Sequence, residues 1–225
     1  MARQPRQSIP DVALHVIQRG NNRAACFRHD SDFLLYLAQL RHLVPLAGCS
    51  LHAYCLMPNH VHLLLTPSRE DSCSQLMKQL GQRYAQYFNK RHGRTGTVWE
   101  GRFRSCLVNT AHYLIACYRY VELNPVRAGI VMHPSFYPWS SYAANIGERA
   151  EQALSPHAEF LALATNERGR ATAYKDLVAQ DLAPAVVDAI RIATNAGVPV
   201  GTRRDRTRDD RSGLKKRQGS DPSLF

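Results

Sequence analysis

The amino-acid sequence predicts an α+β fold of the ferredoxin-like (RRM-like) type. Short stretches of alternating apolar and polar residues occur between longer stretches whose apolar residues recur at helical spacing, in the order β-α-β-β-α-β-α. Such a split β-α-β repeat forms an antiparallel sheet with its helices on one face. We therefore expect the opposite face of the sheet to be open for a ligand.

The first half of the chain supplies three of the expected strands. Residues 13–20, ALHVIQRG, alternate in polarity and end at a Gly-Asn-Asn turn. After an Asp/Ser cap at residues 30–31, a helix is indicated by the spacing of Phe33, Leu34, Tyr36, Leu37, Leu40 and Leu43. Two strands follow, 50–57 and 60–67, joined tightly by Pro58-Asn59.

The second half continues with a helix over about 72–90 and a basic loop, RHGRTGTVWEG. Residues 102–108, RFRSCLV, are the fourth expected strand. A third helix begins at the cap before Ala111 and must stop or kink at Pro125, because proline cannot continue a helix.

Composition and charge indicate the class of partner. The 225 residues are 44% hydrophobic, which is ordinary for a globular protein, but the net charge is +11. A basic surface gains free energy by releasing counterions from phosphates, so we expect a nucleic acid as partner. No run approaches the ~18 apolar residues of a membrane span, and the start lacks an apolar signal core, so we expect a cytoplasmic, nucleoid-associated protein without membrane contact. The six cysteines show no CxxC pair and are expected to be reduced, buried and not zinc ligands.

Two histidines stand out in the stretch LMPNHVHLLL. Residues i and i+2 of a strand share a face, so His60 and His62 project together with Leu64. Val61, Leu63 and Leu65 project to the other face, which is expected to meet the helices. Two polar residues on a half-exposed strand are the alternative explanation, because a two-residue motif matches often by accident.

The third helix carries a second candidate group. On a helical wheel Leu114, Cys117, Tyr118 and Val121 form an apolar stripe, and Tyr113, Tyr120, Asn124 and Arg127 fall on a neighbouring face. A phenol and an amide would therefore approach the histidines if this helix packs near their strand. The alternatives are that Tyr120 is a core aromatic residue and Asn124 only ends the helix. Glu122 is expected at the surface or in a salt bridge.

Four motifs, LMPNHVHLLL, GRTGTVWEGRFRS, RYVELNPVRAGIV and YPWSSY, occur in the order and spacing typical of REP-associated tyrosine transposases. The chain thus resembles this group of single-tyrosine HUH transposases, which have an IS200-like transposase domain, closely over residues 9–142 and loosely over the next fifty. The resemblance implies that His60 and His62 are the HUH pair, Tyr120 the nucleophile and Asn124 the third metal ligand. Tyr118 and Tyr113 stay open as alternative phenols. The resemblance also implies a catalytic domain over 1–130. Composition predicts the rest: the sequence becomes aromatic and proline-rich after 130 and then helical, which indicates a helical extension over 131–200, and a basic, disordered tail follows over 201–225.

The chemistry of these residue types agrees with that implication. A phosphodiester anion repels nucleophiles, and a divalent cation neutralises its oxygens. Two imidazoles and an amide oxygen suit Mg²⁺ or Mn²⁺. A tyrosine nucleophile keeps the cleaved 5′ end bound as a phosphotyrosine, so that a 3′-OH can rejoin the strands.

The loop over residues 90–104 is the expected DNA-binding element. It contains five Lys/Arg and one acid, interleaved with Trp99 and Phe103, and basic residues with aromatic rings suit single-stranded or hairpin DNA. The candidates for DNA contact are Arg94, Trp99, Arg102, Arg104 and Arg127. A solvated loop that Trp99 anchors to the core is the alternative.

The resulting hypothesis is a metal-dependent DNA strand transferase that acts on hairpin-forming repeats as a monomer or homodimer. One rival is an RRM-like module that binds nucleic acid without cutting it, and a second is a metal phosphoesterase that uses water. The C-terminus departs from the family, since the sequence turns abruptly polar after GVPVG and has eight Lys/Arg over 203–217.

Overall fold

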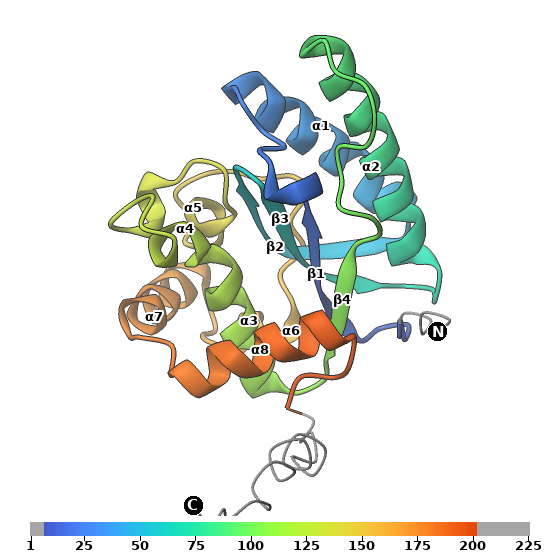
Figure 1. Cartoon of the computed structure of the whole chain (residues 1–225). Coiled ribbons are helices and arrows are strands. Elements are labelled where there is room, and N and C mark those ends of the chain that lie inside the picture. Colours follow the sequence, from blue (N-terminus) through green and yellow to red (C-terminus); the bar gives the residue numbers. More distant parts are fainter. Residues whose placement is uncertain (1–6, 202–225) are drawn as a thin grey trace, which may run out of the picture.

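A computed structural model describes residues 7–201 of the chain. Its first elements are β1 (Ala13–Arg19), α1 (Asp30–Leu46), β2 (Cys49–Met57), β3 (His60–Pro67), α2 (Ser72–Arg91), β4 (Arg104–Val108) and α3 (Ala111–Glu122), with a 3-10 turn, η1 (Asn21–Arg23), after β1. The order β-α-β-β-α-β-α predicted from the sequence is therefore confirmed (Figure 1).

The four strands form one antiparallel sheet in the order β2-β3-β1-β4. This is the ferredoxin-like arrangement, and the predicted α+β class is confirmed. In the register of the sheet, His62 of β3 lies opposite Ile17 of β1, which in turn lies opposite Arg104 of β4. Residues in such a row share a face, so the histidine strand and the strand after the basic loop present side chains on the same side.

Helices α1 and α2 cover one face of this sheet. Val61, Leu63 and Leu65 are completely buried in the hydrophobic core between that face and residues of the two helices, such as Leu40 and Leu80. The alternation read from the sequence is confirmed, because the three apolar residues of β3 face the helices.

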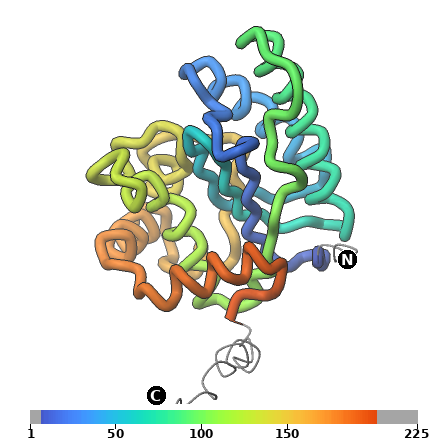
Figure 2. Tube along the Cα trace, viewed as in Figure 1, coloured from blue at the N-terminus to red at the C-terminus, as the bar shows by residue number. Residues whose placement is uncertain are grey.

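The second face is covered as well, which corrects the expectation of an open face. Helix α3 packs on β2 and β3, and α8 (Pro184–Ala196) packs on β4 and β1 (Figure 1). In Figure 2 the orange-red segment after residue 180 runs beside β4 and β1. Leu64 of β3, Val121 of α3 and Ile190 of α8 join one core here. The physical reason is that apolar residues of the C-terminal helices need burial, and the sheet offers the complementary surface.

The C-terminal helices α4 (Asn124–Arg127), α5 (Tyr142–Asn145), α6 (Ala158–Leu161), α7 (Glu167–Ala179) and α8 follow α3, with a 3-10 turn, η2 (Pro134–Phe136), between α4 and α5. They correct the expectation for Glu122, which is completely buried. Its carboxylate accepts hydrogen bonds from Ser141, from Asn145 at 2.7 Å and from Tyr174 at 2.6 Å. These partners lie 19 to 52 residues away, so helical spacing alone did not reveal them.

The basic tail predicted over 201–225 lies outside the described residues, except for Gly201.

Helix α3 begins and ends where the sequence predicts. Thr110 caps the helix by accepting a hydrogen bond from the Tyr113 backbone, and α3 ends at Glu122. Pro125 then occupies the first turn of α4, where a missing N–H costs little.

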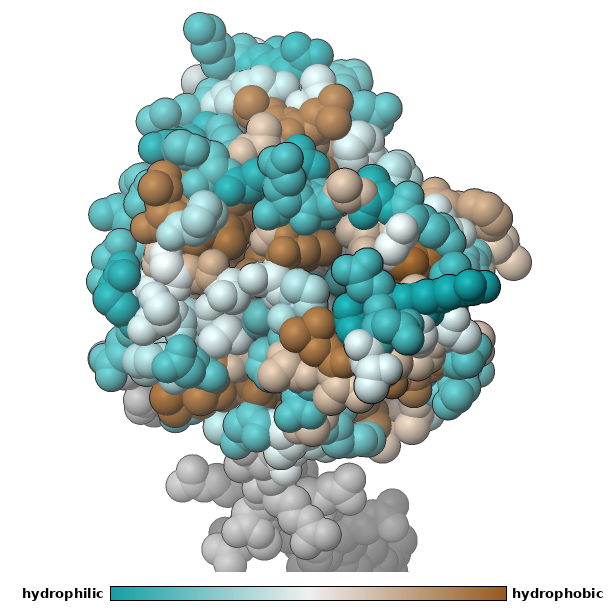
Figure 3. All heavy atoms as spheres, turned by 180° about the vertical axis from the view of Figure 1, so that it is seen from behind, coloured by the Kyte–Doolittle hydropathy of each residue, from teal (hydrophilic) through white to brown (hydrophobic). Residues whose placement is uncertain are grey.

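All six cysteines are buried and none forms a disulfide. Within residues 7–201 no helix is both long enough and apolar enough to span a membrane. The face seen in Figure 3 is mainly hydrophilic, with separate apolar patches.

Candidate active site

The two histidines of β3 lie together on the face that α3 covers. Their rings meet edge to face, with centroids 4.9 Å apart. His62 is only 2% exposed and His60 is half-buried. The predicted common direction of the pair is confirmed, and the alternative of two polar residues on a half-exposed strand does not describe His62.

Tyr120 is the phenol that the fold brings to these histidines. Its ring lies edge-on to the His62 ring at a centroid distance of 5.8 Å and to the His15 ring at 5.5 Å. Tyr118, two residues earlier, turns away, stacks on Phe160 and accepts a hydrogen bond from the His157 backbone at 3.1 Å. Of these two tyrosines only Tyr120 lies against the histidines.

Burial controls the electrostatics of the cluster. It lowers the pKa of His60 to about 4 and that of His15 to about 3, with Arg19 and Arg127 contributing in the same direction. Burial and the neighbouring imidazoles also lower the pKa of His62. All three imidazoles are therefore neutral at pH 7, the form in which a histidine binds a metal.

The same two histidines use their Nδ1 atoms for hydrogen bonds within the protein. His60 Nδ1 lies 2.6 Å from Asn59 Oδ1, and His62 Nδ1 lies 2.9 Å from His15 Nε2. Asn59 Nδ2 donates to the Arg23 carbonyl, which fixes its amide so that Oδ1 faces His60. Within residues 7–201 no hydrogen bond engages Nε2 of either histidine, so both Nε2 atoms are left for another partner. A pair of neutral imidazoles with Nδ1 engaged fits a divalent cation.

The side chain of Asn124 contacts the backbone of Tyr120. Its Nδ2 donates to the Tyr120 carbonyl at 3.0 Å and to the Val121 carbonyl at 3.3 Å, so the amide nitrogen is engaged while Oδ1 keeps its acceptor capacity. The role of Asn124 as a metal ligand stays a prediction.

Three residues of the cluster were missed by the sequence reasoning: His15, Asn59 and Arg19. Arg19 lies opposite His60 in the register, and its charge lowers the pKa of that histidine. A signal for His15 existed, since it alternates onto the same face of β1 as Ile17, the residue opposite His62. That signal requires the pairing of β1 with β3, which the sequence alone does not state.

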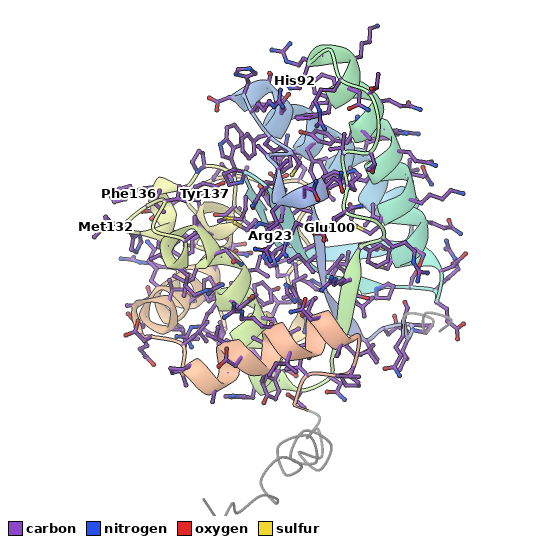
Figure 4. The ribbon with its side chains drawn as sticks, viewed as in Figure 1. Arg23, His92, Glu100, Met132, Phe136 and Tyr137 are labelled. Atoms are coloured by element: carbon purple, nitrogen blue, oxygen red, sulfur yellow. The ribbon has the colours of Figure 1, made fainter. Side chains whose placement is uncertain are left out.

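Exposed arginines surround this end of the sheet. Arg102 and Arg104 are exposed, and together with Arg19 they line one small pocket. Glu100, labelled close to Arg23 in Figure 4, lies with Arg102 in the loop between α2 and β4. Its backbone N–H donates to the Arg19 carbonyl. Arg94 lies elsewhere, with its guanidinium over the Phe88 ring at 5.5 Å. DNA contact by Arg94, Arg102 and Arg104 stays a prediction.

Trp99 is buried, whereas DNA contact was expected of it. The side chain is only 6% exposed, and the ring packs against Tyr84 and donates its Nε1–H to the Gly81 carbonyl at 3.0 Å. The anchoring alternative therefore describes this residue, because a buried ring offers no face for a base. Arg127 is also engaged, since it stacks on Tyr120 and donates to its carbonyl at 2.6 Å.

Comparison with known proteins identifies the family of the chain. The family model described as "Transposase IS200 like" matches residues 8–124, which include β1, both histidines and Tyr120. The chain belongs to the IS200-like transposase family. A protein of Haemophilus influenzae, provisionally named a REP-associated tyrosine transposase, is 28% identical over 104 residues. That match covers 42% of this chain and 59% of the relative, so it spans little more than half of the relative's length.

A solved structure of a REP-associated tyrosine transposase bound to a REP hairpin has a similar fold. The TM-score is 0.54 at 16% sequence identity, and the match covers 70% of this chain and 93% of that one. The resemblance to an IS200-like transposase that the motifs indicated is thus confirmed.

Proposed function

We propose that this IS200-like transposase is a metal-dependent DNA strand transferase that cleaves and rejoins single-stranded DNA at hairpin-forming repeats. The observation that carries the proposal is the contact between the Tyr120 ring and His62, one of the paired histidines. A phenol beside two imidazoles with free Nε2 atoms combines a nucleophile with a place for a cation. The hairpin substrate is inferred from the relatives, one of which was solved with a REP hairpin.

His60 and His62 would hold Mg²⁺ or Mn²⁺ through Nε2, with Asn124 Oδ1 as the third protein ligand. When bound, such a cation neutralises the oxygens of the scissile phosphate. Tyr120 Oη forms the new bond to phosphorus and loses its proton, and the bond to the 3′ oxygen breaks, so that this oxygen leaves and takes up a proton. Cleavage and rejoining then share one site, because a 3′-OH can attack the phosphotyrosine in the reverse step.

The arginines at the rim would contact the DNA backbone. Arg104 is exposed on the side of the sheet where His62 lies, and the exposed Arg102 lines the same pocket as Arg104. Positive side chains at this place attract phosphates and position the strand without reading its sequence. The protein would act in the cytoplasm, where it meets the nucleoid, as a monomer or homodimer.

The two rival functions differ in observable ways. A non-catalytic RRM-like module stacks bases on an open sheet face, but helices α3 and α8 cover that face here. A metal phosphoesterase that uses water forms no covalent intermediate. The deciding experiment is to incubate the full-length protein with labelled hairpin DNA and Mn²⁺ and to separate the products on a denaturing gel. We expect a labelled protein–DNA adduct; cleavage without any adduct would contradict the proposal.

A further inference from the structure

A chain of buried polar groups connects helix α8 to His62. Thr194 Oγ1 lies 2.7 Å from the Ile190 carbonyl and 2.8 Å from His15 Nδ1. His15 Nε2 lies 2.9 Å from His62 Nδ1. Thr194, His15 and His62 are each at most 3% exposed, so water does not replace these contacts.

The direction of each hydrogen bond follows from the chemistry of its partners. A carbonyl only accepts, so the single hydroxyl proton of Thr194 points to Ile190. The Cys106 thiol, whose Sγ lies 3.2 Å from Thr194 Oγ1, is then a donor to that oxygen. The hydroxyl oxygen must then accept from His15, whose Nδ1 carries a proton. His15 is 1% exposed, and its two ring nitrogens contact a hydroxyl and an imidazole rather than a carboxylate, so the ring carries only one proton. With that proton on Nδ1, His15 Nε2 is bare and accepts from His62. His62 therefore carries its proton on Nδ1 and has a free lone pair on Nε2.

We propose that Thr194 and His15 are positioning residues that hold His62 in the tautomer whose Nε2 binds the divalent cation. This inference rests on the proposed function in one respect, that the ligand of His62 is a divalent cation. His60 has its own local partner in Asn59, so the two histidines are fixed by separate sets of contacts. The contacts of His62 end at Thr194, which lies 179 residues after His15. Thr194 belongs to helix α8, which packs on β4 and β1. The C-terminal extension thereby supports the metal site.

The first test reads the tautomer directly in metal-free, full-length protein. Histidine labelled with ¹⁵N gives different long-range ¹H–¹⁵N correlations for the two tautomers. In the wild-type protein we expect His62 protonated at Nδ1. Thr194→Val has nearly the same shape without the hydroxyl, and His15→Leu lacks the acceptor, so both should give a mixture with Nε2–H. Thr194→Ser and His15→Gln keep a hydroxyl and an acceptor and should preserve the wild-type state.

The second test measures Mn²⁺ binding to the same proteins without DNA by calorimetry. Loss of such an outer partner typically weakens metal affinity by about 10- to 100-fold, which we expect for Thr194→Val and His15→Leu. Thr172→Val is the matched control, because Thr172 on α7 makes the same contact with the carbonyl four residues earlier but is exposed and makes no contact with His15. Its affinity should stay within about twofold, as should that of the two conservative variants.

Thermal melting checks that each variant is folded, and His15→Leu gives the same comparison if Thr194→Val unfolds. The proposal is overturned if folded Thr194→Val or His15→Leu keeps His62 entirely in the Nδ1–H form or binds Mn²⁺ as tightly as the wild-type protein. Failure of the proposed function looks different: no adduct forms with DNA although the tautomer of His62 still depends on Thr194.

Discussion

Arg127 lies over the face of the Tyr120 ring, with its guanidinium carbon 4.2 Å from the ring centroid. Its Nη2 also donates to the Tyr120 carbonyl at 2.6 Å, so one side chain contacts both the ring and the backbone of the proposed nucleophile. Burial raises the pKa of the Tyr120 phenol, and the charge of Arg127 acts in the opposite direction. A cation on the ring favours the phenolate, which is the nucleophilic form.

Replacing Arg127 with Met should therefore move the pH dependence of adduct formation to higher pH. Each unit by which the phenol pKa rises lowers the phenolate population at neutral pH about tenfold. Single-turnover adduct formation between pH 6 and 9 measures the shift. Arg127→Lys keeps the charge and should show a smaller one; identical profiles for the wild-type and Met proteins would exclude this role.

Tyr120→Phe should abolish the covalent adduct while folding and hairpin binding persist, because only one hydroxyl is lost and the ring still packs. The control is Tyr118→Phe, which removes the acceptor of the His157 backbone N–H and should cost about 1 kcal/mol of stability without loss of the adduct. Denaturing gels and urea unfolding read the two effects. An undiminished adduct in Tyr120→Phe would shift the nucleophile to Tyr118 or Tyr113.

His60→Ala and His62→Ala should each abolish metal-dependent cleavage and strongly weaken Mn²⁺ binding, whereas the affinity for hairpin DNA should change little. Calorimetry with Mn²⁺ and fluorescence anisotropy with labelled hairpin separate the two properties. His42→Ala is the control, since His42 is exposed on α1, on the opposite side of the sheet. Unchanged Mn²⁺ binding in the double histidine variant would show that the pair is structural.

The burial of Glu122 predicts that the free energy of unfolding depends on pH. Burial raises the pKa of this carboxyl from 4.5 to about 7. A group whose pKa is higher in the folded state stabilises the protein below its unfolded pKa and loses that contribution as pH rises, here between about 4.5 and 7. The loss is on the order of 3 kcal/mol. Glu122→Gln stays neutral, so its stability relative to the wild-type protein should increase through that window and then level off.

Urea unfolding at pH 5, 6, 7 and 8 tests the prediction for Glu122. Glu148→Gln removes the same charge from an exposed ion pair with Lys175 and should change stability by less than about 1 kcal/mol at every pH. A constant difference between Glu122→Gln and the wild-type protein across the four pH values would contradict the assignment.

Arg102→Gln with Arg104→Gln should weaken binding of hairpin DNA and reduce its dependence on salt. Each lost phosphate contact lowers the slope of log affinity against log salt by roughly 0.7 for single strands. The control is Arg83→Gln with Arg168→Gln, which removes two exposed charges from α2 and α7. Anisotropy over a salt series compares the pairs, and equal slopes would remove Arg102 and Arg104 from the interface.

Local patterns in the sequence determined the order of the elements and the direction of the histidines. The alternation in HVHLLL defined two faces of β3 because successive side chains of a strand point to opposite sides. The spacing in α3 separated Tyr118 from Tyr120 in the same way. Four ordered motifs then connected these residues with one family of transposases.

Only the tertiary structure decided what covers the second face of the sheet and which groups support the site. The burial of Glu122, the inward position of Trp99 and the contacts from Thr194 through His15 to His62 join segments far apart in the chain. Periodicity reports which side of an element is apolar, but not the surface against which that side packs. A buried polar group needs a partner, and the fold alone determines which distant residue provides it.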